Sequence, residues 1–319
     1  MRGWLIFCCA LIFAMVVLGG ATRLTESGLS IVEWAPLSGA IPPLSQSEWR
    51  TLFEAYQQTP EFKTYNFWMQ LADFQSIFWM EYAHRLLGRL IGVVFLAGFI
   101  WFYARGAVRG RLAGQLAIAF VLGVGQGALG WYMVKSGLVD QPDVSHYRLA
   151  AHLALAVAIY GWLLWIVLDL SGAKRGEGGH RFAVVLLCWV SVAMVWGAFT
   201  AGLDAGTLYP TFPLMGGQLV PPGAFEMQPA WLNLTQNGAT VQFVHRCLAL
   251  SFVVLVIAYW WRERTRASAW LAGVALLQAC LGVATLLTGV SVPVAAIHQA
   301  NALALFSTAV WGVWAAKEG

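Results

Sequence analysis

The sequence predicts an all-α integral membrane protein whose eight transmembrane helices form two pseudo-symmetric four-helix bundles. Three observations lead to this prediction. The composition is 59% apolar and only 11% charged over 319 residues, apolar runs long enough to cross a bilayer recur along the chain, and the two halves share short motifs in the same order. A soluble domain carries roughly 25% charged residues. The composition therefore excludes an ordinary water-soluble domain, a disordered chain and a basic nucleic-acid-binding protein.

Eight apolar runs are long enough to span a bilayer, which takes about 20 residues of helix. They cover residues 3–22, 84–104, 112–133, 149–169, 182–203, 241–261, 268–289 and 294–315. The first run also has the character of a signal peptide's apolar region, but no small-residue cleavage site follows at the expected place. Because this run has a counterpart later in the chain, we take it as the first helix.

The placement of Lys and Arg predicts that both termini are cytoplasmic, since cytoplasmic segments of membrane proteins are enriched in basic residues. With the N-terminus inside, the inner segments carry eleven basic and four acidic residues, and the outer segments carry eight basic and eleven acidic ones. The inner basic residues are Arg2, Arg105, Arg109, Arg111, Lys174, Arg175, Arg181, Arg262, Arg264, Arg266 and Lys317, and the inner acidic residues are Asp169, Glu177, Glu263 and Glu318.

Two outer loops are long, residues 23–79 and 204–240. The first is too long for a simple connector and contains a predicted surface helix. Ser45-Gln-Ser-Glu48 has the pattern of a capping box, and Trp49, Leu52, Phe53 and Tyr56 follow on one face. We expect this face to lie on the membrane interface or on the helix bundle.

The two halves repeat each other. The motif Gln126-Gly-Ala-Leu-Gly130 is matched by Gln278-Ala-Cys-Leu-Gly282, and Tyr82-Ala-His84-Arg85 is matched by Phe243-Val-His245-Arg246. A weaker match links Val17-x-Gly19-x-x-Thr22 with Val195-x-Gly197-x-x-Thr200. His152 and His298 open the fourth and eighth predicted helices. Four helices repeated in the same direction predict a tandem duplication. The expected domains are residues 1–170, with the long outer loop 23–79, and residues 171–319.

Four of the six histidines, His84, His152, His245 and His298, fall within the first turns of even-numbered predicted spans and so near the outer membrane face. A single intramembrane histidine more often satisfies a local hydrogen bond, but four at one depth, two in each half, indicate function. Zinc needs three or four protein ligands, whereas haem needs only two axial ones. We therefore predict one haem site at His84 with His152 and a second at His245 with His298.

Three arginines are candidates for binding haem propionates. Arg85 and Arg246 each follow a histidine of the predicted sites, and Arg148 precedes His152 by one turn. Guanidinium groups pair well with carboxylates, although snorkelling of each arginine to the interface explains its position about equally well. Arg89 is deeper and is expected to have a partner.

Glu81 breaks the symmetry of the two predicted sites. It precedes His84 by three positions, on the same helix face, whereas the matching position before His245 is the neutral Gln242. A carboxylate beside one of two haems predicts different roles for the two sites. It can orient the histidine or act as a base, and the pattern does not choose between these.

These motifs resemble the haem A synthase family over nearly the whole chain, most closely its alphaproteobacterial and mitochondrial branch. The resemblance lies in Gly19 to Trp34, Ile77 to Arg89, Gln126 to Leu138, Thr211 to Met215, Val241 to Arg246, and His298-Gln299. The five cysteines all fall within predicted spans, in agreement with a branch that lacks cysteine pairs in its outer loops. Met80 and Tyr82 stand where tryptophans are common, and Thr235-Gln-Asn237 where a glutamate is frequent.

The resemblance implies oxidation of the C8 methyl group of haem O to a formyl group, which gives haem A for cytochrome c oxidase. It assigns the substrate haem to His84 and His152, a resident haem B to His245 and His298, and catalysis to Glu81. It further implies a multi-pass protein of the bacterial inner membrane with its haem sites toward the periplasm. Haem O synthase and cytochrome oxidase assembly factors are the expected partners. The electron acceptor is not identified, and a homo-oligomer is left open.

Two other functions remain as alternatives. A di-haem b-type cytochrome that oxidises a quinol explains the four histidines equally well, but it gives no reason for Glu81. A transporter built on a tandem repeat is weaker, because no broken helix or midplane charge cluster is present.

Overall fold

The computed structural model describes residues 1–35, 38–139, 142–173, 176 and 179–316, and in this part of the chain every regular element is a helix. The long helices are α1 (Arg2–Leu24), α3 (Leu71–Ala104), α4 (Gly110–Val139), α5 (His146–Asp169), α6 (His180–Gly202), α8 (Gly238–Glu263), α9 (Arg266–Leu287) and α10 (Val292–Ala316). Shorter helical segments are η1 (Ser38–Ala40), α2 (Gln46–Gln57), η2 (Phe62–Asn66), η3 (Ala205–Thr207), η4 (Ala230–Leu232) and α7 (Asn233–Gln236). Five residues used to predict the topology, Lys174, Arg175, Glu177, Lys317 and Glu318, lie outside the described residues.

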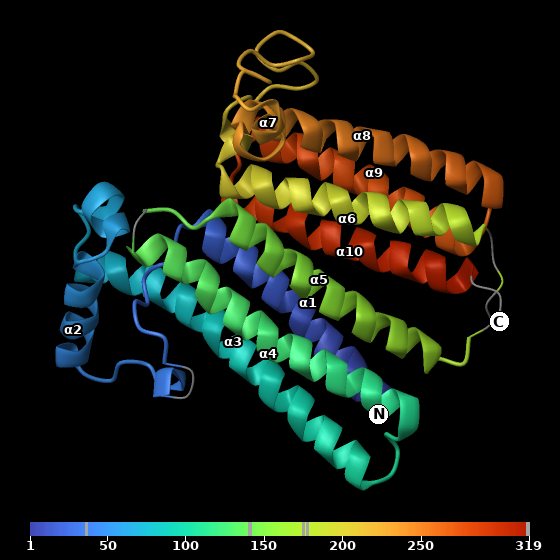
Figure 1. Ribbon diagram of the computed structural model, residues 1–319, viewed down its shortest axis with the longest axis horizontal. Coiled ribbons are helices and arrows are strands. Elements are labelled where there is room, and N and C mark those ends of the chain that lie inside the picture. Colours follow the sequence, from blue (N-terminus) through green and yellow to red (C-terminus); the bar gives the residue numbers. More distant parts are fainter. Residues whose placement is uncertain (36–37, 140–141, 174–175, 177–178, 317–319) are drawn as a thin grey trace. The chain divides into compact units, whose positions relative to one another are not determined.

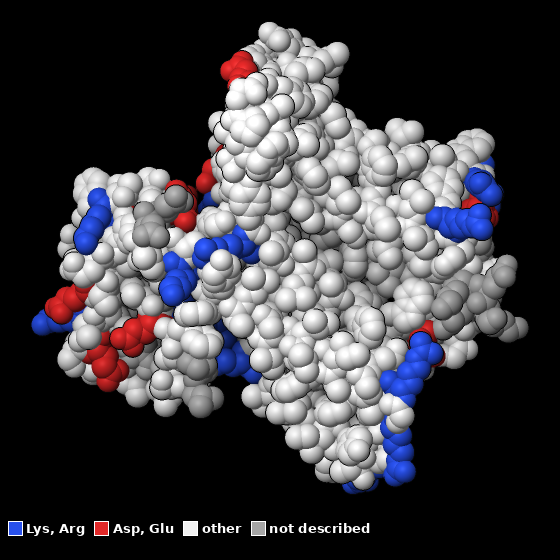
Figure 2. All heavy atoms as spheres, viewed as in Figure 1, with Lys and Arg blue, Asp and Glu red and all other residues white. Residues whose placement is uncertain are grey.

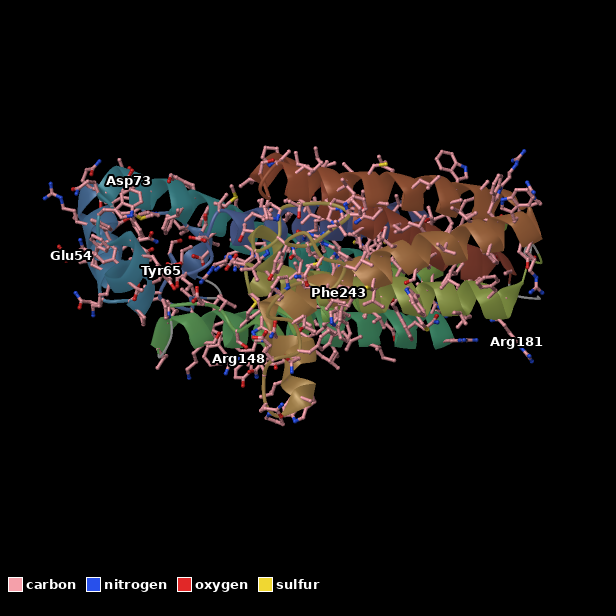
Figure 3. The ribbon with its side chains drawn as sticks, turned by 90° about the horizontal axis from the view of Figure 1, so that it is seen from above. Glu54, Tyr65, Asp73, Arg148, Arg181 and Phe243 are labelled. Carbon is pink, nitrogen blue, oxygen red and sulfur yellow. The ribbon has the colours of Figure 1, made fainter. Side chains whose placement is uncertain are left out.

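Seven of the long helices are apolar and long enough to cross a membrane: α1, α3, α4, α5, α6, α8 and α9. Their surfaces are largely free of charge, and in Figure 2 the coloured Lys, Arg, Asp and Glu atoms gather near helix ends. Arg181, for example, points away from the helices at the start of α6 (Figure 3). This is the structure of an integral membrane protein. The remaining long helix, α10, carries the polar side chains His298, Gln299 and Asn301 between apolar segments.

The chain divides into two compact units, residues 10–156 together with Met1, and residues 2–9 together with 157–319. In the first, α3 runs beside α4, and α2 packs on α3 (Figure 1). In the second, α10 contacts α9 and α6, and α8 contacts α6 and α9, so that these four helices share one interior. The interior of the second unit is apolar, with Phe252, Leu303 and Trp314 among its buried side chains.

The helix that carries His84 starts earlier than the apolar pattern indicates. The predicted span begins at residue 84, but α3 begins at Leu71. Its first turns contain Asp73, Gln75 and Ser76, whose polarity hides the helix from a search for apolar runs. This end is stabilised by packing outside the span, because Phe74 and Phe78 lie against Trp49 of α2, with ring centroids 6.4 and 4.8 Å away.

The predicted surface helix is confirmed as α2, and its apolar face packs on the helix bundle. Ser45 is the N-cap residue and its hydroxyl accepts from the Glu48 N–H at 3.3 Å. The reciprocal bond of a capping box is displaced by one residue, since the Glu48 carboxylate accepts from the N–H of Leu44. Trp49 and Tyr56 are buried in the aromatic cluster formed with α3.

The long loop of residues 204–240 contains only the short helical segments η3, η4 and α7 and is held together by polar side chains. Asn233 accepts from the N–H of Met227 and donates to its carbonyl oxygen. Asn237 donates to the carbonyl of Gly223, and the Thr240 hydroxyl accepts from the N–H of Phe225. These bonds satisfy backbone groups that no helix or sheet pairs. The loop projects beyond the start of α8 (Figure 1).

Candidate active site

The structure brings the four intramembrane histidines together in two pairs. His84 on α3 lies close enough to His152 on α5 for the two rings to interact electrostatically, and His298 on α10 stands in the same relation to His245 on α8. His152, His245 and His298 lie early in their helices, as expected. His84 does not, because α3 begins at Leu71, and the residue lies well inside its helix.

Each pair has a glutamine beside one of its histidines. The side-chain nitrogen of Gln126 on α4 lies 3.4 Å from Nε2 of His152 and donates to its backbone carbonyl at 2.9 Å. The side-chain nitrogen of Gln278 on α9 also lies 3.4 Å from Nε2 of His298, and its oxygen accepts from Asn301 at 2.8 Å. Both glutamines belong to the motif that recurs in the two halves. The sequence therefore contained the signal for them, although they were not singled out as site residues.

The ring nitrogens fit ligation of a haem iron by imidazole pairs. Nδ1 of His245 lies 3.1 Å from the carbonyl oxygen of Ala193, which can only accept, so Nδ1 carries the proton and Nε2 is left for a metal. Nδ1 of His152 and Nδ1 of His298 are buried with no hydrogen-bond partner in the described structure. Buried polar atoms usually have a partner, and these two rings lack the hydrogen bond that Nδ1 of His245 makes.

No three His, Cys, Asp or Glu side chains within the described residues form a group that could hold a metal ion. Two imidazoles complete the coordination of haem iron, because the macrocycle supplies the other four nitrogens. The residues present therefore fit a haem.

Glu81 is 2% exposed, and both of its oxygens are hydrogen-bonded. Oε1 accepts from Nε and Nη2 of Arg85 at 2.9 and 2.6 Å. Oε2 accepts from the Ser30 hydroxyl at 2.7 Å and from the Ile31 N–H at 2.8 Å. Arg85 also donates to the carbonyl of Ile31. Glu81 and Arg85 therefore hold the segment that follows α1 against α3. Glu81 lies one turn before His84 on this helix.

Gln242 occupies the matching position in the second unit and makes bonds of the opposite polarity. Its Nε2 donates to the carbonyl oxygens of Gly206 and Tyr209 at 3.2 and 3.3 Å. Its Oε1 and Nε of Arg246 are both buried without a hydrogen-bond partner in the described structure. Glu81 and Gln242 are both anchors, in that each holds the loop that follows the preceding spanning helix. Glu81 does so by accepting from the loop, and Gln242 by donating to it.

The three arginines singled out from the sequence all contact backbone carbonyls. Arg85 donates to Glu33 as well as to Ile31, and Arg246 donates to Tyr209 and Thr211 at 2.6 and 2.7 Å. Arg148 donates to the carbonyl of Tyr132 at 2.7 Å and lies 3.7 Å from the centroid of its ring. The partner expected for Arg89 is the carbonyl of Ala35, at 2.9 Å.

The outer segment of the first unit contains a buried acid that the sequence did not single out. The Glu61 carboxylate is 6% exposed and accepts from the Tyr56 hydroxyl at 2.8 Å, and Asn66 donates to the same hydroxyl at 2.7 Å. Burial raises the pKa of Glu61 to about 7, and the hydrogen bond from Tyr56 opposes this rise. The charged groups that face it, and that raise its pKa further, are Glu81, Glu26 and Asp143.

The fold and this site define a class of protein: an all-helical membrane protein with partly buried histidines paired between its helices. The chain belongs to the COX15-CtaA family, described as cytochrome oxidase assembly protein, whose model matches residues 2–310. It is similar to "Heme A synthase" of Nitrosospira multiformis, with 50% identity over 323 residues that cover 97% of this chain and 91% of that protein. Proteins of the same name from Parvibaculum lavamentivorans and Rhodospirillum centenum are 46% and 47% identical, and the matches cover 97% of this chain and 92% and 86% of theirs.

Proposed function

We propose that this protein is a haem A synthase, which oxidises the C8 methyl group of haem O to the formyl group of haem A for cytochrome c oxidase. The observation that carries the proposal is the similarity, along 97% of the chain, to curated proteins of that name. With water as the source of oxygen, conversion of a methyl to a formyl group releases four protons and four electrons. The site therefore needs a group that accepts protons and a route for electrons.

His84 and His152 are the axial ligands of the substrate haem in this proposal, and His245 with His298 holds a resident haem B. A resident haem supplies one-electron redox chemistry when bound. The proximity of the histidines within each pair supports this assignment, as does the hydrogen bond of His245 Nδ1 to Ala193, which leaves Nε2 for a metal.

Glu81 handles protons beside the substrate. Gln242, at the matching position of the second site, is an amide and cannot serve as a base. The Ile31 N–H and the Arg85 guanidinium can only donate, whereas the Ser30 hydroxyl can turn from donor to acceptor. A proton that reaches Oε2 of Glu81 is therefore accommodated by rotation of the Ser30 hydroxyl, without disturbing the other three bonds.

Arg85, Arg148 and Arg246 bind haem propionates at the rims of the two sites. Each lies on the same helix as a histidine of its site. Arg246 retains a buried Nε with no partner in the described structure, which is a free donor for an anionic group. Arg148 lies flat on Tyr132, which holds the guanidinium in one orientation.

Eight spans, with α10 as the last, form two four-helix bundles over residues 1–170 and 171–319 in this proposal. Both termini are cytoplasmic, and both haem sites lie toward the periplasm of the bacterial inner membrane. The excess of basic residues in the inner segments supports the orientation. The matching contacts of Gln126 and Gln278 with their histidines support the repeat. Haem O synthase and oxidase assembly factors are the proposed partners. The electron acceptor and a homo-oligomeric state are not assigned.

The test is to express the protein with a haem O synthase in a host that makes no haem A, and to extract the haems. We expect haem A with the wild-type chain. For Glu81→Gln we expect the rate of formation to fall by at least about a hundredfold, as for loss of a general acid or base, and for His84→Ala we expect none. Glu54→Gln, which changes an exposed carboxylate on α2, should leave the rate unchanged.

Retention of haem b in these variants reports that the second site is folded. Full haem A production by Glu81→Gln and His84→Ala would refute the proposed active site. Haem b without haem A in the wild type, under these conditions, would favour the di-haem electron-transfer cytochrome instead.

A further inference from the structure

A glycine of another helix faces the imidazole of each histidine in the two pairs. The glycine always comes from the spanning helix that precedes the histidine in the chain. The pairs are Gly19 of α1 with His84, Gly130 of α4 with His152, Gly197 of α6 with His245, and Gly282 of α9 with His298. The same arrangement is found in both units, which are built from different helices.

The contacts are tight for a side chain. A methyl group would lie 3.0 Å from the ring of His84 at Gly19, 2.9 Å from that of His152 at Gly130, and 3.1 Å from the rings of His245 and His298 at Gly197 and Gly282. Atoms in favourable van der Waals contact stand about 3.5–4.0 Å apart. The ring must therefore shift at Gly130, and at the other three positions it must give by a few tenths of an ångström.

Other glycines of the same helices lack this contact. A methyl group at Gly127, three residues before Gly130 on α4, would meet nothing within 4 Å, and the same is true of Gly273 on α9. Close packing is not confined to the glycines that face a histidine, since a methyl group at Gly161 on α5 would lie 2.9 Å from the Phe306 ring and one at Gly137 on α4 would lie 2.6 Å from Leu29. Gly127 and Gly273 are matched controls for Gly130 and Gly282, because they share a helix with them and have open space.

Two of the four imidazoles lack a hydrogen bond that would fix the orientation of the ring, so the contact with a glycine matters most for these two. Histidine ligands are usually oriented by a hydrogen bond from the second ring nitrogen, and His245 has such a bond to Ala193. Nδ1 of His152 and Nδ1 of His298 have no such bond in the described structure. The Gln126 and Gln278 side chains contact these two rings only at Nε2, at 3.4 Å, and the facing glycines, Gly130 and Gly282, are part of the packing that restrains the rest of each ring.

We infer that Gly19, Gly130, Gly197 and Gly282 are positioning residues, each of which fixes the plane of the imidazole beside it and thereby the axial geometry of the haem iron. The inference rests on the proposed function, since it takes the four histidines as haem ligands. The space beside each of these glycines is filled by the imidazole that faces it.

The contact at Gly19 differs from the other three. At Gly130, Gly197 and Gly282 the nearest ring atom is Cε1, and Nε2 is 3.6, 3.7 and 3.9 Å away. At Gly19 the nearest atom is Nε2 of His84 itself. A methyl group at Gly19 therefore meets a nitrogen that would bind iron, whereas a methyl group at the other three positions turns the ring and leaves that nitrogen accessible.

The experiment compares Gly282→Ala with Gly273→Ala, two changes of the same kind on α9. Each protein is purified in detergent, and bound haem b is measured by its absorption, its reduction potential and the electron paramagnetic resonance of its low-spin ferric form. We expect Gly282→Ala to shift the low-spin signal and the potential and to lower haem retention by about tenfold, the lower end of effects from groups that orient metal ligands. Gly273→Ala should match the wild type.

The same comparison on α4 uses Gly130→Ala and Gly127→Ala, with haem O retention as the readout. Gly19→Ala is expected to have the largest effect, converting the substrate haem to a high-spin form because His84 no longer ligates.

A double-mutant cycle keeps the inference testable when a glycine variant changes the stability of the fold. The thermal stability lost through Gly282→Ala should return when His298→Ala removes the ring, because the methyl group then has space. An equal loss with and without His298, or haem b signals in Gly282→Ala identical to those in Gly273→Ala, would overturn the inference. Absence of any haem from the wild-type protein would instead refute the proposed function.

Discussion

Ser30 is distant from Glu81 in the sequence but completes the hydrogen bonding of its carboxylate. The histidines stand out in the sequence because ionisable groups in an apolar span are costly, and Glu81 stands out because it precedes His84 by three positions where the second half has Gln242. Ser30 and Ile31 could not, because they lie 51 and 50 residues from Glu81 and meet it only when the segment after α1 folds back on α3. Glu61 was missed for a related reason, since an acid in a polar loop gives no sign that it will be buried.

Glu61 gives the protein a pH-dependent stability. Its pKa is raised from 4.5 to about 7 on folding, chiefly by burial, so between these values the folded state binds more protons than the unfolded state. The contribution of Glu61 to stability is therefore complete below about pH 4.5 and is lost as the pH rises through 7. The slope is at most about 1.4 kcal/mol per pH unit for one proton.

We expect Glu61→Gln to remove this part of the pH dependence, because an amide still accepts a hydrogen bond from Tyr56 but does not titrate. The measurement is thermal unfolding in detergent at several pH values from 4.5 to 8, with the wild type and Glu54→Gln for comparison. Parallel curves for Glu61→Gln and wild type would show that Glu61 is ionised in the folded state throughout this range.

At the scale of elements, the first turns of α3 are stabilised by α2. Trp49 is the contact most central to this packing, since its ring lies against both Phe74 and Phe78. Burial of a tryptophan in such a cluster is worth about 3–5 kcal/mol. We predict that Trp49→Ala releases α2 and frays α3 before His84 is reached.

Hydrogen exchange of α2 and of residues 71–80 measures this release. Glu54→Ala is the matched control, because Glu54 lies on the exposed side of the same helix (Figure 3). Unchanged exchange of residues 71–80 in Trp49→Ala would show that the start of α3 is stable without α2. The apolar spans and α2 could be predicted from their periodicity, but this extension could not, because its stability comes from a tertiary contact and not from its own composition.

At the scale of the whole molecule, the prediction concerns topology. We expect Arg109, between α3 and α4, to face the cytoplasm, and Leu219, in the outer loop after α6, to face the periplasm. Arg109→Cys and Leu219→Cys, each made in a chain whose five native cysteines are replaced, are to be labelled with a membrane-impermeant maleimide in spheroplasts. Both positions are exposed.

Leu219→Cys should react in intact spheroplasts, and Arg109→Cys only after the membrane is opened. The reverse pattern would invert the proposed orientation. Sequence reasoning reached the all-helical membrane class from the composition and from the apolar runs long enough to span a bilayer. It did not yield the packing of the helices, because lipid-facing and helix-facing sides of an apolar span have similar residues.

The opposite hydrogen-bond polarity of Glu81 and Gln242 limits how the two halves can be recombined. A chimera that placed Glu81 over the loop of the second half would set acceptor against acceptor in a buried position. The carboxylate would face the carbonyl oxygens of Gly206 and Tyr209. The reverse exchange is less restricted, because an amide at the position of Glu81 can turn its oxygen toward the N–H of Ile31 and accept from it. A glutamate anchor must therefore be transplanted together with its own loop.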